Sequence, residues 1–218
     1  MVKISVWTDY ACPFCYIAEA RIDNLVKEMG IEDQVEFDYH SFELYPDAPK
    51  DVQETTVVRF AKKYGLTEKK AADRIDKIAE MGRAEGLDFN YSSTLNTNSM
   101  DAHRLTQYVN SLGDPKLTKR VSDLLFDAYF GKNLKLADHD VLMNVAKAAG
   151  LDLTKVKEVL ESNAFYDKVR ADENFIMKQG VNAVPFFIID NKGIMGAQPK
   201  NVFKQVITDA LQNDKNAN

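Results

Sequence analysis

The stretch Asp9-Tyr10-Ala11-Cys12-Pro13-Phe14-Cys15-Tyr16-Ile17-Ala18 contains both cysteines of this 218-residue chain. A disulfide between residues so close in sequence would restrict the unfolded chain very little, so a purely stabilising role explains them poorly. Residues 2–8 alternate in the manner of a strand, and apolar residues at helical spacing run from Ile17 to Gly30. The cysteines are therefore expected where a strand gives way to the N-terminus of a helix.

This position suits redox chemistry. Unpaired backbone N–H groups and the helix dipole favour a thiolate at a helix N-terminus, which is the place of Cys12. Cys15 returns to the same helix face about one turn later and is expected to be more buried. Cys12 can then exchange with a partner disulfide while Cys15 resolves the mixed disulfide. Pro13 suits the first helical turn, where no N–H is needed, and helps to fix the two sulfurs.

The pattern changes twice along the rest of the chain. A second strand is predicted around residues 35–39, and Pro46 ends regular structure after it. From about residue 51 to about residue 180 the chain is predicted to be helical, with one apolar helix face over residues 117–129 and another helix between Asp138 as N-cap and Gly150 as stop. After the helical block, a central strand is predicted at residues 184–190, followed by a hairpin turn at residues 191–193 and a short strand at residues 194–196. Pro199 is predicted to occupy the first position of a last helix.

Pro185 stands at the start of that central strand, where a proline forfeits a ladder hydrogen bond. A cis bond between Val184 and Pro185 would turn the chain and leave the backbone of Val184 free to pair with an extended substrate segment beside the cysteines. A trans proline on an edge strand is the alternative.

Composition excludes several classes of function. The net charge of −5, with acids and bases interleaved, provides no extended basic face for nucleic acid and does not favour an acidic membrane surface. The longest apolar run, residues 184–189, is far shorter than a membrane span. No apolar leader precedes the first strand, so a cytoplasmic location is expected, with a mature form whose signal has been cut away as the alternative.

A zinc site and an ordinary core position are the alternatives to redox chemistry for the two cysteines. A structural zinc ion is bound by four ligands, yet the sequence has no second Cys-x-x-Cys motif. The three histidines, His40, His103 and His139, are too far apart in sequence to match the spacing of zinc ligands. Two incidental buried cysteines are simpler, since cysteine is often just part of a core. The placement between strand and helix favours the redox interpretation.

The order β-α-β, helical block, β-β-α resembles a thioredoxin-like fold, and the large helical block resembles the DsbA family. A closer resemblance, to the FrnE-like branch of that family, rests on five segments spread along the chain: residues 9–18, 42–46 (Phe-Glu-Leu-Tyr-Pro), 102–105 (Ala-His-Arg-Leu), 125–130 (Leu-Phe-Asp-Ala-Tyr-Phe) and 196–199 (Gly-Ala-Gln-Pro). The resemblance implies an α/β protein whose residues 1–46 and 181–218 form a discontinuous thioredoxin-like domain, with residues 47–180 as an inserted helical domain.

The resemblance also implies a thiol–disulfide oxidoreductase, with Cys12 attacking, Cys15 resolving and Pro185 as a cis proline facing the substrate. Val184, Pro13 and Phe14 join Pro185 as expected substrate-binding residues. No metal or organic cofactor is expected, because the dithiol carries the electrons and can exchange with glutathione. Protein or small thiol and disulfide substrates are the expected partners, and a homodimer is left open.

Two departures from the family pattern affect the expected redox poise. Many members have Trp or His where Phe14 stands, and Phe14 cannot donate a hydrogen bond to a thiolate. No second cysteine pair that could relay electrons follows the last helix. His103 is expected to be mainly a packed or surface residue, whereas Asp9, Tyr10 and Glu43 are candidates to tune Cys12 or contact substrate.

Two further functions stay open at this point. A glutathione-dependent isomerase or kappa-type glutathione transferase resembles the same fold, although those relatives carry a hydroxyl where Cys12 stands. A chaperone-like protein would instead bind unfolded chains near Pro185 through exposed aromatic residues such as Phe14 and Tyr16.

Overall fold

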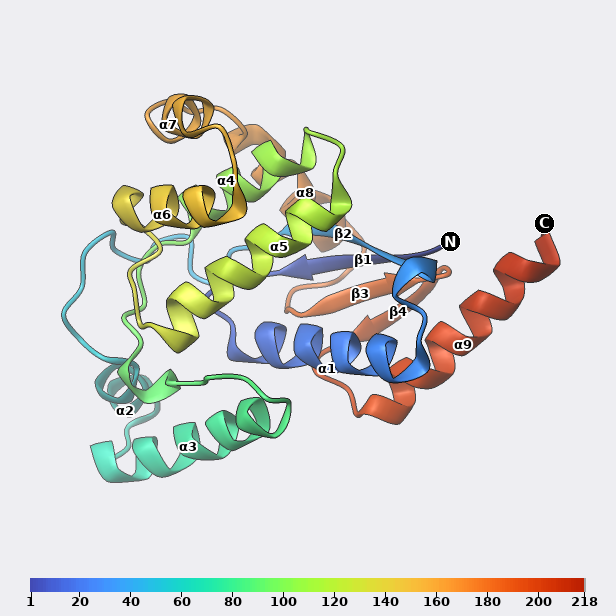
Figure 1. Cartoon of the computed structure of the whole chain (residues 1–218). Coiled ribbons are helices and arrows are strands. Elements are labelled where there is room, and N and C mark those ends of the chain that lie inside the picture. The colour runs from blue at the N-terminus through green and yellow to red at the C-terminus, as the bar shows by residue number, and fades with distance from the viewer. Residues whose placement is uncertain (218) are drawn as a thin grey trace.

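The computed structural model, described here for residues 1–217, is built on a four-stranded sheet in the order β2-β1-β3-β4 (Figure 1). Strand β1 (Val2–Thr8) pairs in parallel with β2 (Val35–Ser41) and antiparallel with β3 (Phe186–Ile189). Strand β4 (Lys192–Met195) pairs antiparallel with β3 at the sheet edge. The first and last parts of the chain therefore share one sheet.

Two helices cover one face of this sheet (Figure 1): α1 (Pro13–Met29), which follows β1, and α9 (Lys200–Ala217), which follows β4. Alternate residues of β1 point toward them, because side chains of a strand alternate between its two faces. The resulting core joins side chains of both helices to the strands, among them Ile4, Val6, Ile22, Phe187 and Phe203. It fixes the start of α1, and with it the cysteines, at the end of β1.

The helical block predicted from the sequence lies between β2 and β3. Its helices are α2 (Thr56–Tyr64), α3 (Glu68–Ala84), α4 (Met100–Asn110), α5 (Pro115–Phe126), α6 (His139–Ala149), α7 (Leu153–Leu160) and α8 (Tyr166–Lys178). Single turns connect elements at η1 (Glu32–Gln34), which precedes β2, η2 (Tyr91–Ser93) and η3 (Asp127–Gly131). Helices α4, α5 and α8 pack against β2, whereas α3 packs against α1. The sheet thus has helices of the block on the side opposite α1 and α9 (Figure 1).

Several predicted helix ends are confirmed. Gly30 and Gly150 end α1 and α6 in the left-handed conformation, with φ of 63° and 83°, a conformation that costs glycine little. The Asp138 side chain accepts a hydrogen bond from the backbone N–H of Asp140 at 2.9 Å, as expected of an N-cap.

Three local predictions were wrong in detail. The hairpin turn lies at Asp190 and Asn191, which both have positive φ, and not at residues 191–193; two such residues match the twist of the flanking strands. The helix expected through residue 129 changes at Asp127 to a π turn, which is common at functional sites. Pro199 immediately precedes α9, which starts at Lys200.

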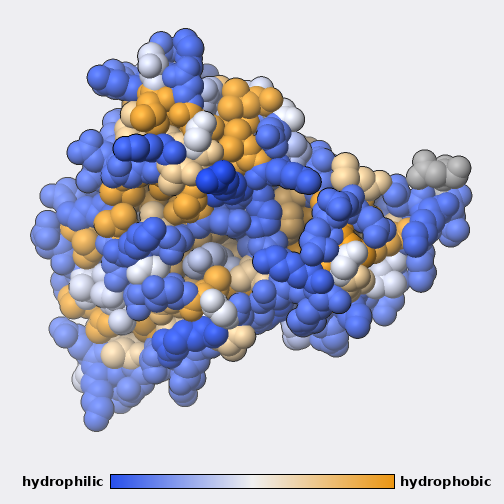
Figure 2. Space-filling model, in the orientation of Figure 1, coloured by the Kyte–Doolittle hydropathy of each residue, from blue (hydrophilic) through white to orange (hydrophobic). Residues whose placement is uncertain are grey.

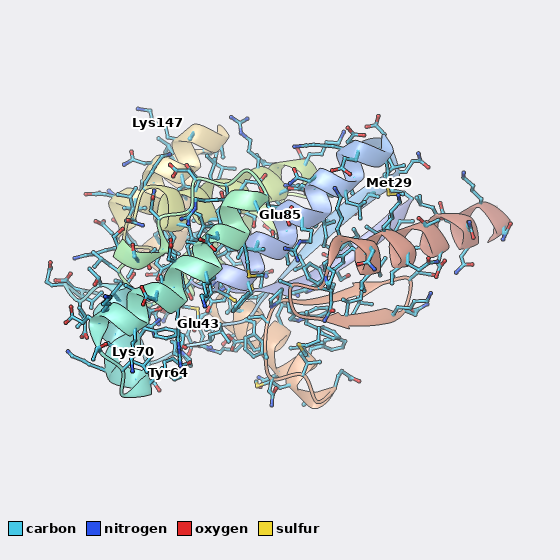
Figure 3. The ribbon with its side chains drawn as sticks, turned by 90° about the horizontal axis from the view of Figure 1, so that it is seen from below. Met29, Glu43, Tyr64, Lys70, Glu85 and Lys147 are labelled. Carbon is cyan, nitrogen blue, oxygen red and sulfur yellow. The ribbon has the colours of Figure 1, made fainter. Side chains whose placement is uncertain are left out.

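Arg21 connects three distant parts of the fold. Its Nε donates to Oε1 of Glu85 at 2.6 Å, and its Nη1 donates to the carbonyl oxygens of Ala197 and Gln198 at 3.0 and 2.7 Å. These contacts join α1 to the end of α3 and to the segment that leads into α9. Figure 3 shows Glu85 at the end of α3 beside α1.

The surface seen in Figure 2 is hydrophilic over α1. Hydrophobic residues gather mainly in the upper part of the view, where Figure 1 shows helices α4 to α7. Within residues 1–217, none of the helices combines the length and apolar character needed to cross a bilayer.

Candidate active site

Cys12 occupies the N-cap position of α1, with an extended backbone (φ −91°, ψ 115°), and Pro13 begins the helix. The backbone N–H of Cys12 donates to the carbonyl oxygen of Asp9 at 2.9 Å, which closes the turn between β1 and the helix. The Cys12 side chain makes no capping hydrogen bond, so it is the dipole of α1 that favours negative charge on the sulfur at this position. Only 3% of Cys12 is exposed.

Val184 lies directly beside this sulfur. The Cys12 thiol donates to the Val184 carbonyl oxygen, with 3.7 Å between Sγ and O. The Val184–Pro185 peptide bond is cis, and the Pro185 carbonyl oxygen accepts a hydrogen bond from the backbone N–H of Gly196 at 2.7 Å. The segment before β3 is thus held at the cysteines, with Val184 facing them.

Cys15 is fully buried, and both cysteines are free thiols. Burial, followed by the contact with Cys12, raises the pKa of the Cys15 thiol well above its usual value, although hydrogen bonds from the Asp9 backbone and the Thr8 side chain partly oppose this. A buried thiol of this kind stays protonated at neutral pH, so it needs a proton acceptor before it can attack a disulfide.

The aromatic residues on either side of Cys15 differ in exposure. Phe14 is 38% exposed, but Tyr16 is partly buried and stacks on Phe126 with ring centroids 4.9 Å apart. The prediction that Tyr16 is an exposed aromatic was therefore wrong: the ring fills space between α1 and the helical block. Phe14 is the aromatic side chain of this pair that is open to solvent.

The turn before Cys12 is organised by the buried carboxylate of Asp9. Its Oδ1 accepts from the backbone N–H of Ala11 at 3.0 Å and its Oδ2 from that of Leu44 at 2.7 Å. Burial alone would raise the pKa of Asp9, but His103, whose Nε2 lies 3.6 Å from Oδ1, together with these backbone donors holds it below its usual value. Asp9 and His103 thus fix the chain that leads into the cysteines.

Glu43 belongs to a separate ion-pair network in the same region. Its Oε2 accepts from Arg170 at 2.6 Å, and Arg170 also binds Glu173 on α8. Burial raises the pKa of Glu43, an effect that His103 and Arg170 partly offset. Tyr10 is fully buried, with its hydroxyl 2.6 Å from that of Thr106. These residues support the turn and the loop after β2.

Sequence reasoning missed Glu19, an acid on the buried face of α1 with 2% of its surface exposed. Its two carboxyl oxygens accept hydrogen bonds from Thr8 at 2.8 Å and from Tyr39 at 3.1 Å. Burial raises the pKa of Glu19 to about 8. A signal was present in the sequence: Glu19 follows Cys15 by four residues, amid the apolar positions of an amphipathic helix.

Within residues 1–217 no group of three or more His, Cys, Asp or Glu side chains is arranged to hold a metal ion.

A free dithiol at a helix N-terminus, facing a cis-proline segment on a four-stranded sheet, defines a thioredoxin-like redox protein. Residues 3–208 match the family model of the DSBA-like thioredoxin domain, and the chain belongs to this family. Its α/β fold with a large helical insertion, expected from the sequence, is confirmed.

Similar proteins cover nearly the whole chain. A probable DsbA oxidoreductase from Streptomyces coelicolor is 32% identical, with a TM-score of 0.88 over 97% of this chain and 91% of its own. The uncharacterized protein YwbO of Bacillus subtilis is 27% identical over 95% of this chain and 96% of its own. A 2-hydroxychromene-2-carboxylate isomerase, 15% identical, has a TM-score of 0.74 with 99% of each chain covered, and therefore shares the fold.

Proposed function

We propose that this protein is a thiol–disulfide oxidoreductase in which Cys12 is the attacking thiol and Cys15 the resolving thiol. The observation that carries the proposal is the free Cys12–Cys15 pair at the N-terminus of α1, with Cys12 next to the Val184 carbonyl. Membership of the DSBA-like family supports it. The finer assignment, to the FrnE-like branch, belongs to the same proposal.

In the first step the Cys12 thiolate attacks one sulfur of a substrate disulfide. A bond forms between Cys12 and that sulfur, and the other substrate sulfur leaves as a thiolate and takes a proton from solvent. Cys15, once deprotonated, then attacks Cys12 and releases the second substrate sulfur in the same way. The substrate disulfide is reduced to two thiols and the Cys12–Cys15 pair is oxidised; the reverse sequence forms a substrate disulfide.

The substrate would lie along Val184, Pro185, Pro13 and Phe14. An extended peptide backbone can pair with Val184, while the open ring of Phe14 supplies an apolar contact. Since only 3% of Cys12 is exposed, a small disulfide, or one on an extended segment, is favoured over a disulfide set within a folded surface.

The proposal extends to the setting of the reaction. The dithiol itself would carry the electrons without a metal or organic cofactor, and glutathione would be one exchange partner. The cytoplasm as location, a homodimer as assembly, and the division into residues 1–46 with 181–218 and residues 47–180 remain predictions. Cell fractionation, sedimentation and limited proteolysis test the three in turn.

Single-cysteine variants provide the test. With insulin and dithiothreitol, the wild type should accelerate insulin reduction and Cys12→Ser should not. Cys15→Ser should accumulate a mixed disulfide on Cys12, visible as an adduct by mass spectrometry and released by dithiothreitol. An adduct on Cys15 in Cys12→Ser that forms faster than the adduct on Cys12 in Cys15→Ser would reverse the assigned roles.

A second assay separates this proposal from a glutathione-dependent isomerase or transferase. The wild type is incubated with glutathione and a chromogenic acceptor, and conjugation is followed by absorbance. Conjugation without any insulin reduction would overturn the redox proposal. A double variant, Cys12→Ser with Cys15→Ser, tests the chaperone-like alternative: suppression of aggregation should not depend on the two sulfurs if that function exists.

A further inference from the structure

The outer side of α1 borders a groove that the exchange at the cysteines leaves unused. One end is a recess of about 250 Å³ between α1, α5 and the end of α3, where Tyr16 and Glu85 lie. The other end is a larger recess of about 610 Å³ between α1, α5 and the start of β2. Asp23, Lys27 and Asp123 line both recesses, so the two adjoin. In Figure 3 the Glu85 label marks the smaller recess, beside α1.

The larger recess has an apolar floor. Val26 lines it from α1, and Val35 and Phe37 line it from β2. Pro115 adds the first turn of α5. Val26 and Phe37 are buried, so they form the bottom of the recess. A recess of this size takes a small ligand or a short stretch of peptide, and its floor offers an apolar side chain a place to leave water.

The rim of the larger recess is acidic. Six carboxylates line it against three lysines; the acids are Asp23, Glu32, Asp33, Glu36, Asp114 and Asp123. The N-terminal ammonium group of Met1, which also lines the recess, pairs with Asp214. Lys116 lies 3.8 Å from Asp33. Within residues 1–217, neither Glu32 nor Glu36 forms an ion pair or a side-chain hydrogen bond. The surplus of negative charge attracts a cationic partner.

One ammonium group of the chain itself is already bound in this groove. Nζ of Lys119 lies 2.6 Å from Oδ2 of Asp23 and 2.9 Å from Oδ2 of Asp123. The same nitrogen lies 5.6 Å from the centre of the Phe37 ring, within the range of a cation–π contact. Lys119 neutralises the inner carboxylates, which leaves Glu32 and Glu36 at the rim for the cations of a partner.

We propose that this groove docks a basic segment, with apolar side chains among its lysines or arginines, of the polypeptide that carries the substrate disulfide. The proposal rests on the proposed function and deepens it by naming the class of substrate. The apolar side chains would lie over Val35 and Phe37, and the cationic ones would meet Glu32 and Glu36. Docking makes and breaks no covalent bond, and the exchange itself stays at Cys12.

The length of α1 sets the distance between the disulfide and the docked segment. Asp23 and Lys27 follow Cys12 by 11 and 15 residues. At a rise of about 1.5 Å per residue, this corresponds to about 16 to 22 Å along the helix. An extended chain covers about 3.3 Å per residue, so about five to seven residues should separate the substrate cysteine from its basic segment.

Activated peptides test the proposal. Each peptide carries one cysteine as a mixed disulfide with thiopyridine, followed by a Gly/Ser spacer of about six residues and the segment Lys-Phe-Lys-Leu-Lys. When the Cys12 thiolate attacks the peptide sulfur, the bond from Cys12 to the peptide forms and coloured thiopyridone leaves. At low salt this peptide should react about tenfold faster than one with Glu in place of each Lys, and the difference should shrink as salt is added.

Two further peptides separate docking from general attraction. A spacer of one residue is too short to reach the larger recess, so the short-spacer lysine peptide should lose most of the advantage. Ser in place of Phe and Leu removes the side chains that would lie on the apolar floor, and this peptide should react more slowly than its parent at every salt concentration.

Charge reversal at the rim is the decisive variant. Glu32→Lys combined with Glu36→Lys should slow the long-spacer lysine peptide by about tenfold. It should leave unchanged the rate with dipyridyl disulfide, a small substrate that releases the same thiopyridone. Asp73→Lys combined with Glu80→Lys is the matched control, because both residues are exposed on α3, lie outside the groove and change the net charge equally. This control should slow the lysine peptide less than twofold.

Equal losses with the two charge reversals would reduce the effect to general attraction and would overturn the docking proposal while leaving the oxidoreductase function intact. Equal rates for the long and short spacers would do the same. Failure of the wild type to release thiopyridone from dipyridyl disulfide would overturn the proposed function, and the docking proposal with it.

Discussion

The sulfur of Cys12 lies 3.7 Å from the carbonyl oxygen of Val184, across a separation of 172 residues in the chain. A thiol can donate to that oxygen, but a thiolate cannot. When Cys12 ionises, the Val184 carbonyl becomes available to a backbone N–H of a substrate. In the proposed function, the step that forms the Cys12 thiolate therefore also frees the Val184 carbonyl oxygen to pair with substrate.

Phe14→Ser should weaken the reaction with protein substrates more than the reaction with small disulfides. The open part of the ring can contribute about 1 kcal/mol of apolar contact, or about fivefold in KM for insulin. The rate with dipyridyl disulfide should stay within twofold of the wild type. Tyr64→Ser, which removes an exposed aromatic ring on α2, is the matched control and should alter neither rate. Equal losses with both substrates would place Phe14 in the chemistry of the sulfurs instead.

His40→Gln should flatten part of the alkaline pH dependence of stability. Burial lowers the pKa of His40, but the side chains of Asp172 and Asp38 outweigh it and raise the pKa to about 9. Because the folded pKa exceeds the ordinary value of 6.5, the charged imidazole stabilises the fold below pH 6.5, and this contribution is lost as the pH rises to 9. The loss is on the order of 3 kcal/mol in urea unfolding.

Trp7 supplies an internal reporter for this titration. It is the single tryptophan of the chain, and its ring stacks on His40 with centroids 4.3 Å apart. Its fluorescence should change around pH 9 in the wild type and should not in His40→Gln. A change centred near the ordinary value of 6.5 would contradict the assignment.

Glu19→Gln should make the protein more stable at alkaline pH, whatever its effect on activity. Between pH 4.5 and about 8 the folded state keeps a proton on Glu19 that the unfolded chain loses, so the free energy of unfolding of the wild type falls through this window. Glutamine removes that loss, and the variant should gain on the order of 5 kcal/mol over the wild type between about pH 5 and about pH 9. A parallel pH dependence of the two proteins in urea would contradict the raised pKa.

Arg21→Ala should destabilise the protein by about 3 kcal/mol, because Glu85 and the carbonyl oxygens of Ala197 and Gln198 lose their donor in a partly buried place. Arg21→Lys should recover only part of this, since an ammonium group cannot reproduce the fork of the guanidinium. Arg83→Ala breaks an exposed pair with Asp76 and should cost less than about 1 kcal/mol. Similar losses for the two arginines in urea unfolding would contradict the connecting role of Arg21.

The elements that sequence predicted well are those with local signals. Cys12 and Pro13 mark a helix start, Gly30 and Gly150 mark helix ends, and each signal acts within a few residues. The hairpin turn was predicted at residues 191–193, about a residue too late. In the structure the two positive φ angles of the turn belong to Asp190 and Asn191, and Gly193 lies in strand β4.

The parts of the site that sequence could not predict depend on long-range packing. His103 touches Asp9 only because α4 packs against β2, and Tyr39 reaches Glu19 from the neighbouring strand. The contact of Val184 with Cys12 was expected in general terms from Pro185, but the partners of Arg170 and Arg21 had no local signal at all.

The pairing order of the sheet has a consequence for synthesis on the ribosome. Strands β1 and β2 emerge early and can pair in parallel, but the other edge of β1 has to wait for β3, which emerges after the whole helical block. Until then a nascent chain carries an unsatisfied strand edge next to two reactive thiols, a hazard for aggregation and for wrong disulfides. Slow translation through the end of the message would prolong this vulnerable interval.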